Sequence, residues 1–179
     1  MLARLALVAT FLVAACGGTP ESPNGAEDPV RAEAVSGRFG LAFTLPQAVW
    51  TTSEEIRGEA ALMLAGGGSV ALGASGGGPI AFSIAEVGGT RAMMAASDSS
   101  CETYELSAAA PIGSPIRKSG GWGADDPNAA FYRAFFNDPL LHLPAGVWDI
   151  SAVATFIEGA GCQGQSHELT ATIRISVAD

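Results

Sequence analysis

Two residues of this 179-residue chain, His142 and His167, carry the imidazole that most often serves as a catalytic base. Nucleophilic catalysis needs a serine or cysteine beside such a base and a third group that orients it. Ser114 and Lys118 have three residues between them, one more than the Ser-x-x-Lys motif of some serine-nucleophile enzymes allows. We expect His142 to lie in a strand or turn beside the core and His167 to be exposed at the start of the last strand. The sequence therefore predicts that the protein is not an enzyme.

Three aspartates, Asp125, Asp126 and Asp138, are the residues that come nearest to a cation site. Calcium prefers several carboxylate and carbonyl oxygens on a flexible loop, but EF-hand spacing is absent. Asp-Pro often begins a turn, so solvated turn residues are the favoured interpretation and calcium binding stays open. The glycine runs 66–68 and 76–78 lack the Gly-Lys-Ser/Thr of a phosphate loop and predict turns. We therefore predict no metal and no cofactor.

The composition narrows the class of protein. Hydrophobic residues make up 48% and charged residues 15%, which argues against a disordered chain. The net charge is −9, whereas nucleic-acid binding needs a basic face, so no nucleic-acid partner is expected. The length fits a single domain after removal of any targeting segment.

The N-terminal residues have the order of a targeting segment. Arg4 precedes an apolar run over residues 5–15, which is too short for a membrane-spanning helix of about 20 residues. The run has the length of a signal-peptide core. It closes with Val13-Ala14-Ala15-Cys16, which resembles the lipobox of bacterial lipoproteins. The resemblance implies cleavage before Cys16 and acylation of that cysteine.

Acyl chains on Cys16 would attach the mature chain durably to a membrane, because each buried methylene contributes about 0.8 kcal/mol. We therefore expect a lipid-anchored protein of the cell envelope, outside the cytoplasm. Gly17 replaces the aspartate that retains many lipoproteins in the inner membrane, which favours the outer membrane or the cell surface, depending on the host envelope. An acidic body is repelled by anionic lipid, so membrane contact is expected through the lipid alone.

The cysteine count fits this interpretation. With Cys16 acylated, Cys101 and Cys162 are the two that are left. An even number of cysteines in an exported chain indicates a disulfide, so we predict a Cys101–Cys162 bridge. A redox pair or a metal site is less favoured, because no Cys-x-x-Cys occurs and the histidines are not spaced for zinc around these cysteines.

The sequence as a whole predicts three parts: a signal peptide over residues 1–15, a flexible tether over 16–36 and one folded domain over 37–179. The tether is rich in Gly, Pro and polar residues and lacks periodicity at its start. The domain shows period-two alternation, which is typical of strands with one buried face. Strands are expected at 39–45, 56–64, 69–72, 80–87, 101–106, 147–157 and 168–177, a long connection at 111–126, and a strand or helical turn at 131–136.

This pattern predicts an all-β fold, a single antiparallel sandwich of about seven to eight strands. The last two strands should form a hairpin with Trp148 on its core face. The string from Leu143 to Ala152 also resembles the penultimate strand of immunoglobulin-like and fibronectin-like domains, where an alternating strand opened by an aromatic follows a glycine turn. The resemblance implies an immunoglobulin-like sandwich closed by the final strand.

Trp122 is conspicuous in its loop, Ser-Gly-Gly-Trp-Gly-Ala-Asp-Asp. It either folds back over the sandwich or, with Tyr132, Phe135 and Phe136, contacts a partner, because exposed loop aromatics can anchor partners. The favoured function is a non-catalytic module for binding an envelope protein or glycan, or for a structural role. The alternative is a protease-inhibitor-like domain that presents the loop beginning at Pro111 and ending at Asn128 to an extracytoplasmic enzyme.

Overall fold

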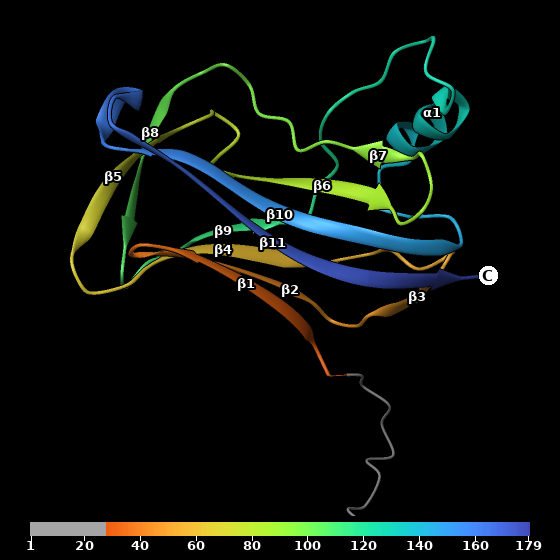
Figure 1. The fold of residues 1–179 in the computed structure, drawn as a ribbon, viewed down its shortest axis with the longest axis horizontal. Helices are drawn as coiled ribbons and strands as arrows, with labels where there is room; N and C mark the ends of the chain where they lie inside the picture. The colour runs from red at the N-terminus through yellow and green to blue at the C-terminus, as the bar shows by residue number, and fades with distance from the viewer. Residues whose placement is uncertain (1–27) are drawn as a thin grey trace, which may run out of the picture.

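The computed structural model describes residues 28–179 (Figure 1). The predicted signal peptide, the lipobox-like string and most of the predicted tether lie outside this range. Within it, the chain forms eleven strands, one α-helix and one short 3-10 helix. They are β1 (Val30–Ser36), β2 (Phe39–Leu45), β3 (Val49–Thr51), β4 (Glu59–Leu64), β5 (Ser69–Ala74), β6 (Ile80–Glu86), β7 (Ala92–Met93), β8 (Glu102–Ser107), β9 (Ile112–Pro115), α1 (Ala129–Asn137), β10 (Gly146–Glu158), η1 (Ala160–Cys162) and β11 (Gln165–Ala178).

Two sheets pack face to face, which confirms the predicted all-β sandwich (Figure 1). The smaller sheet has the order β1-β2-β4-β9. In the larger sheet, of order β3-β11-β10-β5-β8, strand β10 also pairs with β6, and β6 with β7. All pairs are antiparallel except β3 with β11. The strand count exceeds the predicted seven to eight because β3, β7 and β9 are too short to carry a periodic pattern.

The β10–β11 hairpin forms the centre of the larger sheet, as predicted. Its register runs from Gly146 opposite Val177 to Glu158 opposite Gln165. Trp148, fully buried, lies opposite Ile175, and the inward residues of both strands alternate with outward polar ones. The segment 143–152 therefore contributes the penultimate strand, as the resemblance to immunoglobulin-like domains implies, while a relationship to those domains stays a prediction.

Strand β1 corrects the predicted boundary of the tether at residue 36. It pairs along the whole of β2, from Val30 opposite Leu45 to Ser36 opposite Phe39. Its inward positions are filled by Val30 and the small residues Ala32 and Ala34, so the apolar alternation in the sequence is weak. The neighbouring strand β2, rather than the pattern of β1 itself, makes this segment a strand, and the first strand of the described range begins at Val30.

Two further segments differ from expectation. Residues 112–115 lie inside the predicted connection, yet they form β9 by pairing with β4, from Glu59 opposite Pro115 to Leu62 opposite Ile112. The ambiguous segment 131–136 is part of helix α1, whose buried residues Tyr132 and Phe135 are three positions apart, as on one face of a helix. Within residues 28–179, no helix is both long and apolar enough to cross a membrane.

Candidate binding groove

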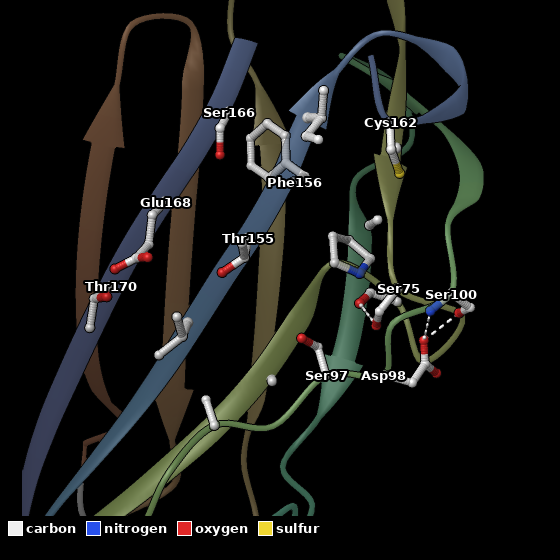
Figure 2. Close-up of a pocket in the computed structure, with 18 of the residues that line it drawn as sticks. Ser75, Ser97, Asp98, Ser100, Thr155, Phe156, Cys162, Ser166, Glu168 and Thr170 are labelled. Atoms are coloured by element: carbon white, nitrogen blue, oxygen red, sulfur yellow. Dashed lines mark hydrogen bonds between the residues drawn. The ribbon is translucent and has the colours of Figure 1, made fainter. Parts of the chain in front are cut away.

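A groove of about 580 Å³ lies on the outer face of the larger sheet, at the end that carries the disulfide (Figure 2). Its floor is formed by outward residues of β10 and β6, among them Val153, Thr155 and Ala81. The first outward residues of β11 border one side. The segment of residues 94–100, here called the strap, borders the other side. The hollow therefore depends on a loop that crosses an otherwise open sheet face.

The strap is fastened to the loop between β5 and β6 through Asp98. The Asp98 carboxylate accepts hydrogen bonds from the Gly76 N–H at 3.1 Å and the Ser100 N–H at 3.0 Å. The Ser100 hydroxyl donates to the same carboxylate, and this bond is the largest cause that lowers the pKa of Asp98. Asp98 therefore stays ionised at neutral pH and fixes the strap in place.

The disulfide closes the upper end of the groove. Cys101 and Cys162 are bonded, with Cα atoms 6.1 Å apart, which confirms the predicted pairing. Gly73 makes the close approach of the Cys162 loop possible, because a Cβ atom on Gly73 would lie 2.7 Å from the Cys162 amide nitrogen and 2.8 Å from its Sγ. Cys162 itself has a φ of +53°. The bridge thus ties the end of the strap to the loop that follows β10.

Ser75 lines the groove and stands in the string Gly73-Ala-Ser-Gly-Gly77, which has the Gly-x-Ser-x-Gly spacing of a nucleophile elbow. An elbow needs a strand followed by a helix and a histidine within reach. Here the strand β6 follows, the Ser75 hydroxyl donates to the Gly78 carbonyl oxygen at 3.2 Å, and neither histidine lines the groove. Ser75 is therefore a turn residue.

His142 lies in the segment between α1 and β10, beside the carboxylate of Asp138. Its Nδ1 is 2.7 Å from Asp138 Oδ2, and this hydrogen bond is the largest cause that lowers the pKa of Asp138. Asp138 also accepts from the Leu140 N–H at 2.8 Å. No serine, threonine or cysteine hydrogen-bonds to either histidine in residues 28–179. The Asp138–His142 pair shapes the turn after α1.

His167 is not exposed, contrary to the prediction. Its side chain is only 9% exposed, and its ring lies 4.8 Å from that of Phe39 and 5.2 Å from that of Phe156, centroid to centroid. Nε2 lies 3.3 Å from a Glu158 carboxylate oxygen but makes no hydrogen bond. The reason is that β11 begins at Gln165, three residues before the predicted start, so His167 already belongs to the inward-facing set of the strand.

Two of the four aromatic residues suggested as a partner surface are buried. Tyr132 and Phe135 are each 5% exposed and face the core, so their prediction as contact residues is wrong. The Tyr132 hydroxyl accepts from the Ala92 N–H and donates to the Ala92 carbonyl oxygen, which binds α1 to β7. Trp122 and Phe136 are half-buried against the core, and Arg133 covers the Trp122 ring at 5.6 Å. The helical spacing of 132 and 135 could have indicated the buried face.

The structure also shows the surroundings of the acidic residues considered for calcium and the course of the loop considered for protease inhibition. Asp126 accepts a hydrogen bond from the Asn128 N–H at 2.7 Å, as a turn residue does. Over the described range, no three side chains of His, Cys, Asp or Glu are grouped so that they could hold a metal ion. The first part of the loop from 111 to 128 follows the sandwich, since it contains β9 and the Ser119 hydroxyl donates to the Phe82 carbonyl oxygen at 2.9 Å. Beyond Ser119, residues 120–125 are exposed except for the half-buried Trp122, and they lead towards α1.

The sequence did not predict this groove. Its carboxylates, Asp98 and Glu168, are far apart in the chain and belong to no motif. The only local signal is the run of polar outward residues at the start of β11. Comparison of the chain with protein-family models, with curated proteins and with solved structures finds no match.

Proposed function

We propose that the protein is a lipid-anchored lipoprotein of the bacterial cell envelope, whose sandwich serves as a non-catalytic module for binding. The cysteine pairing carries this proposal. The disulfide uses Cys101 and Cys162, and the third cysteine of the chain is Cys16, which ends the lipobox-like string. Disulfides persist in oxidising compartments such as the periplasm and the cell surface. The bridge therefore agrees with export, and its pairing leaves Cys16 available for acylation.

The orientation of the sandwich supports a binding role. Strand β1 begins at Val30, opposite Leu45, at the end of the sandwich where β3 pairs with the last residues of β11. The groove lies at the opposite end, beside the first residues of β11 (Figures 1 and 2). Thirteen residues separate Cys16 from Val30, a span of at most about 45 Å when fully extended. A lipid on Cys16 would thus hold the sandwich by one end and leave the groove at the other.

A processing experiment tests the anchor. The full chain and its Cys16→Ser variant are expressed in a bacterium that processes lipoproteins, and each is isolated from membrane and soluble fractions for intact-mass measurement. The wild-type protein should be found in the membrane fraction with a mass that begins at Cys16 plus acyl groups, whereas Cys16→Ser should carry no acyl mass. Gly17→Ala, which leaves the lipobox-like string intact, is the matched control and should be acylated.

Alkylation before and after reduction gives a second readout of the same samples. Two thiols should react only after reduction, because Cys101 and Cys162 are bonded and Cys16 is acylated. A wild-type chain without acyl mass, or a reactive Cys16 thiol before reduction, would refute the proposal.

A further inference from the structure

We propose that the groove binds an extended cationic segment of a partner protein, with lysine or arginine side chains directed at Glu168 and Asp98. This inference rests on the proposed binding function and names the chemistry of the ligand. It follows from the charge of the groove, from the pairing of charges elsewhere on the domain, and from the apolar floor.

The charged residues that line the groove are all negative. They include two carboxylates, Asp98 and Glu168, and no lysine, arginine or histidine. The other polar lining groups are hydroxyls of serine and threonine, such as Thr155 and Thr170. A carboxylate accepts hydrogen bonds only, whereas a hydroxyl can both donate and accept. The charge of the groove therefore favours a ligand that carries positive charge and disfavours an anionic one.

No ion pair within residues 28–179 neutralises these two carboxylates. Arg117 lines an adjoining hollow with Asp98, but its guanidinium donates to the carbonyl oxygens of Gly77 and Ile80. Five arginines form ion pairs with carboxylates elsewhere, for example Arg174 with Asp149 and Arg91 with Glu86. Glu168 is exposed and takes part in none of the ion pairs found in the described range. Figure 2 shows Glu168 and Asp98 on opposite sides of the groove, with Thr155 between them. Both borders of the groove therefore carry a negative charge, and no positive side chain lies on the floor between them. This arrangement suits a cationic ligand that spans the groove.

The floor indicates a peptide rather than a small amine. Val153, Ile157 and Ala81 line it with apolar surface, and Met94 in the strap is 75% exposed beside it. Lysine and arginine side chains pack their methylene stems on apolar surface while the charged group stays at its edge. A chain with alternating small apolar and cationic residues can therefore contact the floor with one set of side chains and the two carboxylates with the other.

The experiment measures binding of a fluorescein-labelled Lys-Val-Lys-Val-Lys peptide by fluorescence anisotropy at low salt, with the full chain carrying Cys16→Ser. Because this variant is not acylated, the result does not depend on whether the anchor proposal is correct. The peptide should bind, and added salt should weaken binding because partly exposed charges are screened. Glu168→Gln should weaken binding up to about fivefold, the range for one exposed ion pair. Val153→Arg, which places a cation on the floor, should abolish it.

The matched control is Glu105→Gln, which removes an exposed carboxylate on β8 outside the groove and should leave affinity unchanged. Glu-Val-Glu-Val-Glu should not bind. The proposal is overturned if the acidic peptide binds equally well, or if Glu168→Gln has the same affinity as Glu105→Gln. Competition by spermidine at the same concentration as the unlabelled lysine peptide would also overturn it, because the ligand would then be a simple polyamine.

Discussion

Removal of the Cys101–Cys162 bridge should destabilise the domain by about 4 kcal/mol. The two cysteines are 61 residues apart in the chain. In the chain-entropy model, a cross-link removes about 2.1 + 1.5R ln n cal/mol/K from the entropy of the unfolded chain, which gives about 4 kcal/mol at 25 °C for a loop of this length. At about 2–4 °C per kcal/mol, the midpoint of thermal unfolding should fall by about 8–16 °C.

The assay is urea unfolding followed by tryptophan fluorescence, in a Cys16→Ser background so that no third thiol can exchange. Trp148 and Trp50 are buried, at 0% and 5% exposure, so their emission should report the loss of the core. The Cys101→Ala/Cys162→Ala variant and the reduced parent should lose the same free energy of unfolding. Both should show a larger denaturant slope, because the unfolded chain without the cross-link exposes more surface. A loss below about 1 kcal/mol would refute the view that the bridge acts on the unfolded state.

Three further predictions concern contacts that hold the groove and α1 in place. Gly73→Ala should cost about 1–3 kcal/mol in urea unfolding, because its Cβ would lie 2.7 Å from the Cys162 nitrogen, whereas Gly121→Ala, with nothing within 4 Å, should cost less than about 0.5 kcal/mol. Tyr132→Phe should cost about 1–2 kcal/mol, since it leaves the Ala92 N–H without its partner, and exchange of that amide with deuterium should speed up. Arg91 lowers the pKa of Glu86 in the folded protein, chiefly through a hydrogen bond, so this pair stabilises the fold at neutral pH. The contribution is lost as the pH falls from the pKa of an unfolded glutamate, about 4.3, through the lower pKa of Glu86 in the folded state. Glu86→Gln should therefore flatten the dependence of the urea midpoint on pH in this acid range, and an unchanged slope would contradict the assignment.

Much of the fold follows from the sequence, because strands with one buried face alternate visibly. Strand β2 has the predicted bounds, and the β10–β11 hairpin carries long apolar residues such as Trp148 and Ile175 at every second position. The disulfide also follows from counting, because two of the three cysteines lie within the predicted domain. These features depend on the alternation of apolar and polar residues and on the number of cysteines, both of which can be read from one sequence.

Other features depended on neighbours that are distant in the chain. Strand β1 has small inward residues and becomes a strand because β2 pairs with it, and β9 forms because β4 offers an edge. His167 is buried because two more inward-facing aromatics, Phe39 and Phe156, pack on its ring.

The groove shows the same dependence most clearly. Asp98 and Glu168 border the same groove only because the strap, fastened at Gly76 and by the disulfide, crosses the outward residues of β10. Each residue alone is an ordinary exposed carboxylate, and no local spacing relates the two. Local pattern and cysteine parity were thus sufficient to predict the class of fold and the bridge, and they are the basis for expecting an anchor. The position of the charged groove could be found only from the folded chain, because it depends on packing between segments that are distant in the sequence.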